Sequence, residues 1–214
     1  MTFQAVLFDM DGTLINSEPY WLIAETELMA DFGYQWQLSD QSHCLGGPLP
    51  KVGRYMSDLA GGAEDWEFFM NSLVHRVTDK FHQGLDFMPG ALELLEDLHA
   101  QSIPLALVSA SPRSLVQAAL DSLPRGYFQL SISNDDVMNT KPHPESYLKA
   151  AALLKVEISE SLVLEDSITG VTSGIASGAK VLAIPHLVTI ESHPRVRVVS
   201  SLVNTTLESI ASLF

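Results

Sequence analysis

FQAVLFDMDGTL, residues 3–14, is an apolar run followed at once by two carboxylates. Residues 3–8 are long enough for a short strand, and their Val and Leu content suits a strand that is buried. Asp9 and Asp11 follow where this strand is expected to end. Four more short apolar runs end in polar clusters in the same way, at residues 103–108, 130–133, 162–164 and 180–184. The last run, residues 196–199, fits either an extra edge strand or a loop.

Segments with helical periodicity lie between these runs. Residues 89–101 (PGALELLEDLHAQ) begin with proline and repeat apolar side chains at Ala91, Leu94, Leu95 and Leu98. Residues 112–123 and 144–154 also begin with proline, which suits the first turn of a helix. Strands that alternate with helices predict an α/β fold, with a Rossmann-like parallel sheet and helices on both of its faces.

The pattern changes between residues 17 and 81, where no strand is needed. Three helices are expected there, at residues 18–32, 51–59 and 64–81, separated by glycine pairs. We therefore expect an all-helical domain at residues 16–83, inserted after the first strand of a core formed by residues 1–15 and 84–214. The two linkers, near residues 15–18 and 82–87, are candidate hinges.

Composition narrows the classes of function. The chain has 214 residues, a formal net charge of −14 and one cysteine, Cys44. An acidic surface repels nucleic acid and anionic lipid, so neither is expected as a partner. No secretory leader is recognised, and no apolar run approaches the roughly 20 residues that span a bilayer. With no disulfide possible within the chain, a cytoplasmic location is expected.

Polar side chains follow each of the first four expected strands. In chain order they are Asp9 and Asp11, Ser109, Lys141, and Glu165 and Asp166. Because ligands bind outside the carboxyl ends of parallel strands, these side chains are expected to converge on one crevice. Carboxylates suit Mg²⁺, and a carboxylate can also attack phosphorus. A second acid can move protons, while a lysine and a hydroxyl can hold phosphoryl oxygens.

Each of these residues also has an ordinary structural explanation when taken alone. Asp9 and Asp11 suit a turn or a helix cap, and Lys141 suits a solvated surface. Glu165 and Asp166 suit the N-terminus of a helix, where acidic residues are favoured. The occurrence of all four groups in order, at successive strand ends, favours a single site.

The same segments resemble the four motifs of the haloacid dehalogenase superfamily, most of whose members are phosphatases. Residues 9–14 (DMDGTL) match the first motif and residues 107–111 (LVSAS) the second. Residues 141–144 (KPHP) match the third, and residues 164–167 (LEDS), followed by Gly170, match the fourth. The resemblance covers nearly the whole chain. It implies a magnesium-dependent phosphatase, often monomeric, whose helical insertion is a small cap that closes over the site.

The resemblance also implies residue roles. Asp9 would be the nucleophile and Asp11 the general acid and base. Mg²⁺ would be held by the Asp9 carboxylate, the Asp11 backbone carbonyl, Asp166, and Glu165 either directly or through water. The phosphoryl group would be held by Ser109, Lys141, Gly12 and Ala110. In so acidic a chain the cation and Lys141 are needed to bring an anionic phosphate to Asp9.

Within the superfamily, residues 16–21 (NSEPYW) are similar to bacterial sugar-phosphate phosphatases, so a small sugar phosphate is the expected substrate. The nearest rival is β-phosphoglucomutase. That family carries a cap histidine where this chain has Trp21 and an arginine where it has Leu49, so water is expected as the phosphoryl acceptor. A non-catalytic phosphate-binding relative is the third alternative, which the complete set of motif residues disfavours. Five cap residues are further candidates for the pocket: Trp21, His43, Leu45, Lys51 and Arg54.

Overall fold

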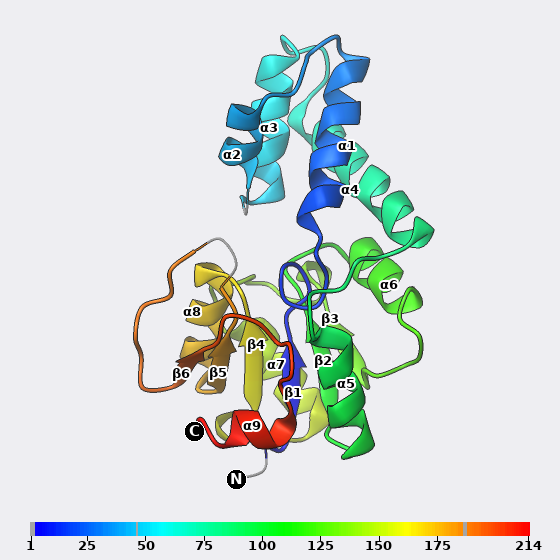
Figure 1. Ribbon diagram of the computed structural model, residues 1–214. Coiled ribbons are helices and arrows are strands. Elements are labelled where there is room, and N and C mark those ends of the chain that lie inside the picture. Colours follow the sequence, from blue (N-terminus) through cyan, green and yellow to red (C-terminus); the bar gives the residue numbers. More distant parts are fainter. Residues whose placement is uncertain (1–2, 46, 186–187) are drawn as a thin grey trace. The chain divides into compact units, whose positions relative to one another are not determined.

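The computed structural model describes residues 3–45, 47–185 and 188–214. Strands in it form one parallel sheet in the order β3-β2-β1-β4-β5-β6 (Figure 1). Their bounds are Val6–Phe8 (β1), Leu105–Val108 (β2), Leu130–Ile132 (β3), Leu162–Glu165 (β4), Lys180–Ala183 (β5) and Val196–Val198 (β6). Every residue of β1, β2 and β4 is buried, as expected for parallel strands covered on both faces. The predicted α/β class is confirmed.

Strand β4 extends beyond the end that the sequence predicts, and β6 decides between the two alternatives left open for the last run. The sequence predicts a fourth strand that stops at Leu164, but Glu165 pairs with Ala183 and is the last residue of β4. Glu165 is therefore held by the sheet, and its side chain is fixed more firmly than one on a loop. The run at residues 196–199, which suits an edge strand or a loop, contains β6, and β6 pairs in parallel with β5.

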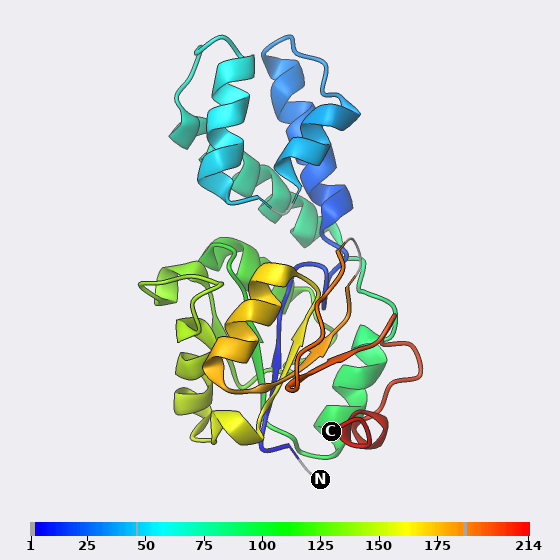
Figure 2. The ribbon, with the colours of Figure 1, turned by 90° about the vertical axis from the view of Figure 1, so that its left-hand side faces the viewer.

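Helices cover both faces of the sheet (Figures 1 and 2). On one face, Tyr147, Ala150 and Val171 pack with Leu7 and Val163 in one buried apolar cluster. The helices over this face include α7 and α8, while α5 and α9 lie over the opposite face. The bounds are Ala91–Ala100 (α5), Arg113–Asp121 (α6), Glu145–Leu154 (α7), Ile168–Ser177 (α8) and Leu207–Ala211 (α9), with short 3₁₀ turns at Asn134–Asp136 and Ile158–Glu160.

Helix α8 is absent from the helices that the sequence predicts, because its residues (ITGVTSGIAS) include two glycines and few strong helix formers. Close packing explains the glycines. A Cβ at Gly174 would lie 2.9 Å from the side chain of Val181 on β5. Ser167 caps the helix by accepting a hydrogen bond from Gly170 N–H at 3.0 Å.

Residues 17–85 contain helices in the described part and no strand. The bounds are Glu18–Asp31 (α1), Leu38–Cys44 (α2), Leu49–Leu59 (α3) and Trp66–Gln83 (α4). The short helix α2 is missing from the sequence prediction because it carries almost no apolar periodicity. Polar contacts hold it instead: buried Asp40 accepts hydrogen bonds from Tyr34 Oη at 3.1 Å and Tyr55 Oη at 2.7 Å.

The chain folds into two compact units. One comprises Met1–Asn16 with Asp86–Phe214, and the other comprises Ser17–Leu85. The predicted insertion spans residues 16–83. Hinge motion at the two linkers stays a prediction. Among the described residues, no helix combines the length and the apolar character needed to cross a membrane.

Candidate active site

A tight loop after β1 places Asp9 and Asp11 at the carboxyl edge of the sheet. Asp9 is buried, and its N–H donates to Leu164 O at 3.0 Å, which ties the start of the loop to β4. The chain then turns at Gly12, whose φ is +79°, and Gly12 N–H donates to Ile15 O at 2.8 Å. A residue other than glycine adopts this backbone conformation at a cost.

Gly12 also makes room for Asp166. A Cβ at position 12 would lie 2.2 Å from Asp166 Oδ2. The sequence prediction gives Gly12 a different role, with its amide at the bound phosphoryl group. In the structure that N–H donates to Ile15 O within the loop, and a contact between the Gly12 amide and a phosphoryl group stays a prediction.

Lys141 joins two of the carboxylates. Its Nζ donates to Asp9 Oδ1 and Glu165 Oε1, each at 2.6 Å, and to Val108 O at 3.0 Å. The Lys141 side chain is 4% exposed. All three hydrogens of the ammonium group therefore have acceptors, and the lysine is fixed against the carboxylate expected to act as the nucleophile.

Glu165 is held from several directions. Its Oε1 accepts from Lys141 Nζ and from Tyr147 Oη at 2.7 Å, and its Oε2 accepts from Ser167 Oγ at 3.2 Å. A Cβ at Gly170 would lie 1.8 Å from the Glu165 carboxyl group, so α8 begins directly against it. Glu165 thus sets the position of Lys141 as well as lying among the possible metal ligands.

Two serines after β2 contact Asp11. Ser111 Oγ donates to Asp11 Oδ2 at 2.8 Å, and Ser109 Oγ lies 3.4 Å from the same oxygen. Ser111 N–H donates to Ser109 Oγ at 2.9 Å. Ala110 lies exposed between them at the turn. The predicted residues Asp9, Asp11, Ser109, Lys141, Glu165 and Asp166 thus gather at one edge of the sheet.

Burial and mutual repulsion perturb these groups. Burial, with Glu165 adding to it, raises the pKa of Asp9 well above its usual range although Lys141 opposes the shift. Burial, Glu165 and Asp11 raise the pKa of Asp166 to about 7. Burial would lower the pKa of Lys141, but Asp9 and Glu165 outweigh it and raise that pKa. The positive charge of Lys141 therefore offsets only part of the repulsion among these carboxylates.

The donor set fits a divalent cation. Asp9, Glu165 and Asp166 each offer an oxygen, and these atoms lie within 4.8 Å of one another. Asp11 Oδ1 is buried and has no hydrogen-bond partner among the described residues. Carboxylate oxygens are the ligands that Mg²⁺ prefers, and a bound cation would relieve the repulsion among them.

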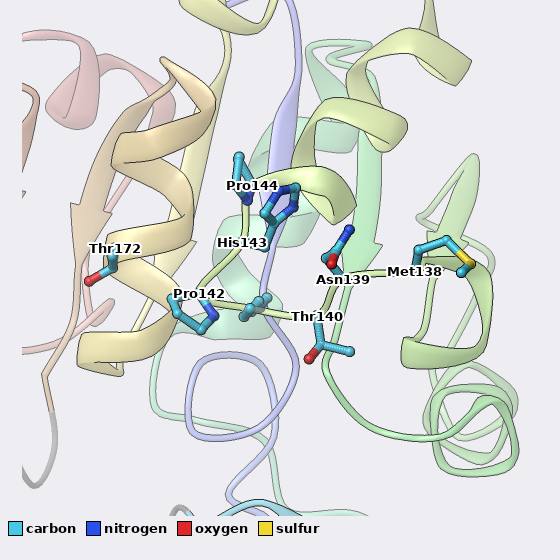
Figure 3. Close-up of a pocket in the computed structure, with 8 residues that line it drawn as sticks. Met138, Asn139, Thr140, Pro142, His143, Pro144 and Thr172 are labelled. Atoms are coloured by element: carbon cyan, nitrogen blue, oxygen red, sulfur yellow. The ribbon is translucent and has the colours of Figure 1, made fainter.

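An open pocket of about 650 Å³ lies on the loop that precedes α7 (Figure 3). Its lining is Met138, Asn139, Thr140, Lys141, Pro142, His143, Pro144 and Thr172. The carboxylates of the site do not line it. Of the site residues named above, Lys141 also belongs to the lining of this pocket.

Comparison with known proteins identifies the family. The family model described as haloacid dehalogenase-like hydrolase matches residues 6–184. The chain belongs to this family.

Known proteins resemble the chain along most of its length. It is 31% identical over 186 residues to a bifunctional riboflavin kinase/FMN phosphatase of Arabidopsis thaliana, covering 85% of this chain and 48% of that protein, so the chain spans about half of that relative. It is 29% identical over 188 residues to hexitol phosphatase B of Escherichia coli K12, covering 85% of this chain and 83% of that protein. The solved structure of a family hydrolase from Entamoeba histolytica has a TM-score of 0.84 at 24% identity and covers 100% of this chain and 99% of that one.

The cap candidates lie in the unit Ser17–Leu85. The His43 ring stacks on Tyr55 with centroids 4.3 Å apart, and the Arg54 guanidinium lies over the Trp66 ring. Lys51 and Leu45 are exposed, and Trp21 is partly buried. Their contact with a substrate stays a prediction.

Sequence reasoning missed Tyr147 and Ser111. Tyr147 sits on the buried face of α7, where a pattern of apolar residues suggests core packing alone. Ser111 had a weak signal, since it is the second serine of the LVSAS segment and lies two residues after Ser109.

Proposed function

We propose that this protein hydrolyses a small phosphate monoester through a phosphoryl group transferred to Asp9, with Mg²⁺ as cofactor. The observation that carries the proposal is the position of the buried Asp9 carboxylate. It lies 2.6 Å from a fully engaged ammonium group and within reach of Glu165 and Asp166. This arrangement both holds a nucleophile in place and provides positive charge for the phosphoryl oxygens.

Each site residue has a separate proposed role in the reaction. Asp9 attacks phosphorus, and Asp11 gives a proton to the leaving oxygen and later takes one from the attacking water. Ser109 and the Ala110 backbone hold the phosphoryl oxygens by hydrogen bonds, and Lys141 holds them by its positive charge. Because the pKa of Lys141 is raised, the lysine keeps its charge over the whole physiological range. Asp9, Asp166, Glu165 and the backbone carbonyl of Asp11 would hold Mg²⁺, which supplies charge neutralisation for the phosphoryl group when bound.

A sugar phosphate or related polyol phosphate is the proposed substrate class. Two features support it: the similarity of residues 16–21 to sugar-phosphate phosphatases, and the relation to a hexitol phosphatase. The complete set of motif residues supports catalysis over simple phosphate binding. We propose a cytoplasmic monomer, and the single buried thiol of Cys44 is in keeping with a reducing compartment.

A screen of phosphorylated metabolites with Mg²⁺, followed by assay of released phosphate, tests the proposal. Asp9→Asn should abolish release, while Asp121→Asn, at the exposed end of α6, should leave it unchanged. A folded wild-type protein that releases phosphate from no ester contradicts the proposal. Product analysis on β-glucose 1-phosphate separates the rival reaction, since glucose 6-phosphate indicates a mutase and free phosphate a phosphatase.

A further inference from the structure

Asp11 is held through one of its two carboxyl oxygens. Oδ2 receives the Ser111 hydroxyl at 2.8 Å and lies 3.4 Å from the Ser109 hydroxyl. Oδ1 is buried and has no partner in the described part of the chain. One oxygen of the carboxyl group is thus held by a hydroxyl, and the other has no partner among the described residues.

Ser111 is itself anchored on both sides of its side chain. Its N–H donates to Ser109 Oγ at 2.9 Å, and its carbonyl accepts from Asn134 N–H at 3.1 Å. Pro112 follows and begins the turn into α6. A hydroxyl on a backbone fixed in this way can hold its partner with little loss of freedom.

The two serines have different tasks under the proposed function. The Ser109 hydroxyl can donate one hydrogen bond, and a bound phosphoryl oxygen would accept it. The 3.4 Å contact from Ser109 to Asp11 is long for an O–H···O bond, so little is lost when it breaks. Ser111 then remains as the hydroxyl on Asp11.

We propose that Ser111 is a positioning residue for the proton transfer by Asp11. Its hydroxyl fixes Oδ2, so that Oδ1 faces the oxygen of the leaving group. In the step that forms the phosphoryl-Asp9 species, the bond from phosphorus to the leaving oxygen breaks and that oxygen takes the Asp11 proton. In the second step the oxygen of water bonds to phosphorus, the bond from phosphorus to Asp9 breaks, inorganic phosphate leaves, and Asp11 recovers a proton from that water. This inference rests on the proposed function.

The leaving group provides the test. The value of kcat/KM reports formation of the phosphoryl-enzyme, so it is measured with a hexitol phosphate and with p-nitrophenyl phosphate. The hexitol alkoxide leaves poorly without a proton, whereas p-nitrophenolate leaves without one. General acid catalysis contributes about 10²–10⁴-fold, and misplacement forfeits part of it. Ser111→Ala should lower kcat/KM by about 10–100-fold for the hexitol ester and by less than about 3-fold for the aryl ester.

Three controls make the test specific. Ser111→Thr keeps the hydroxyl and should stay within about 3-fold of wild type. Ser114→Ala, an exposed serine on α6, should change neither ester. Ser111→Ala made in the Asp11→Asn background should cause no further loss, because a residue that acts through Asp11 has nothing left to position.

Several results count against the inference. Equal losses on both esters, or a change confined to KM, would assign Ser111 to substrate binding. A full additional loss in the Asp11→Asn background would give it a role independent of Asp11. Wild-type protein that releases phosphate from no ester of the screen removes the proposed function and this inference together, whereas an active wild type with a uniform Ser111→Ala loss removes the inference alone.

Discussion

Lys141 shows how a single buried cation organises the site. It contacts Asp9, Glu165 and a backbone carbonyl while its side chain is 4% exposed. Removing one partner of a buried ion pair leaves an uncompensated charge, which typically costs about 3–5 kcal/mol. The structural and the catalytic importance of this lysine therefore have the same origin.

Replacing Lys141 tests its structural and its catalytic importance together. Lys141→Met should lower the free energy of unfolding by about 3 kcal/mol or more and remove activity, because Asp9 and Glu165 lose their shared counter-charge. Urea denaturation and phosphate release measure the two effects. Lys155→Met, at an exposed lysine after α7, should change stability by less than about 0.5 kcal/mol. Equal effects of the two substitutions would show that the buried contacts are unimportant.

The substitution Tyr147→Phe tests the hydroxyl of Tyr147 separately from its aromatic ring. Tyr147→Phe removes the hydrogen bond to Glu165 at 2.7 Å and keeps the ring 4.9 Å from Lys141 Nζ. Since Glu165 retains Lys141 and Ser167, the expected loss of unfolding free energy is about 1–2 kcal/mol, with reduced but measurable activity. Urea denaturation and the same phosphate assay check this. A variant as stable as wild type would mean that the bond contributes nothing.

At this scale the sequence predicts residues that follow strands and misses those that support them. Asp9, Ser109, Lys141 and Asp166 were found because strand ends share one edge of a parallel sheet. Tyr147 was not, because its partner Glu165 is brought near only by the packing of α7 on the sheet.

The loop after β1 and the start of α8 work as paired elements. Gly12 lets Asp166 approach, and Gly170 lets α8 approach Glu165. At both positions a Cβ would overlap a carboxyl group of the site. Glycine at these two places is therefore explained by the site itself, and its effect on the metal ligands can be measured.

Gly12→Ala should displace the Asp166 carboxyl group and weaken metal binding. We expect the Mg²⁺ concentration for half-maximal activity to rise by about 10-fold or more, and the rise in Tm caused by Mg²⁺ to shrink. Gly61→Ala is the matched control, since Gly61 has a similar φ of +68° with no atom near its Cβ position. It carries the same backbone cost and should leave Mg²⁺ dependence unchanged. Identical Mg²⁺ dependence in both variants would exclude the steric explanation.

Elements with apolar periodicity were predictable, and those shaped by contacts were not. The five main strands and the helices that begin near prolines follow from local pattern. Helix α8 depends on glycines that fit the sheet, and α2 depends on Asp40 held by two tyrosines. Those contacts join residues separated in the chain, so a pattern read along it does not reveal them.

The tryptophans and the proposed catalytic carboxylates lie in different units of the molecule. All three tryptophans, Trp21, Trp36 and Trp66, belong to the unit Ser17–Leu85. Tryptophan fluorescence therefore reports on that unit, while the proposed catalytic carboxylates belong to the other.

Glu25 makes the helical unit sensitive to pH. It is 6% exposed, and burial, with Glu18 adding to it, raises its pKa from 4.5 to about 7. The folded unit then binds the Glu25 proton more tightly than the unfolded chain, so the contribution of Glu25 to stability is most favourable below about pH 4.5 and falls until the pH passes about 7. A full shift of this size corresponds to about 3 kcal/mol.

Glu25→Gln should remove this dependence, because the amide does not ionise. Relative to wild type, the variant should gain about 2–3 kcal/mol of unfolding free energy between pH 5 and pH 8, measured by urea denaturation with tryptophan fluorescence. Glu64→Gln, at an exposed position of the same unit, should track wild type throughout. Taking the difference between variant and wild type cancels the other titrating groups. A difference that stays constant from pH 5 to pH 8 would show that Glu25 ionises normally in the folded protein, and that burial does not set its charge.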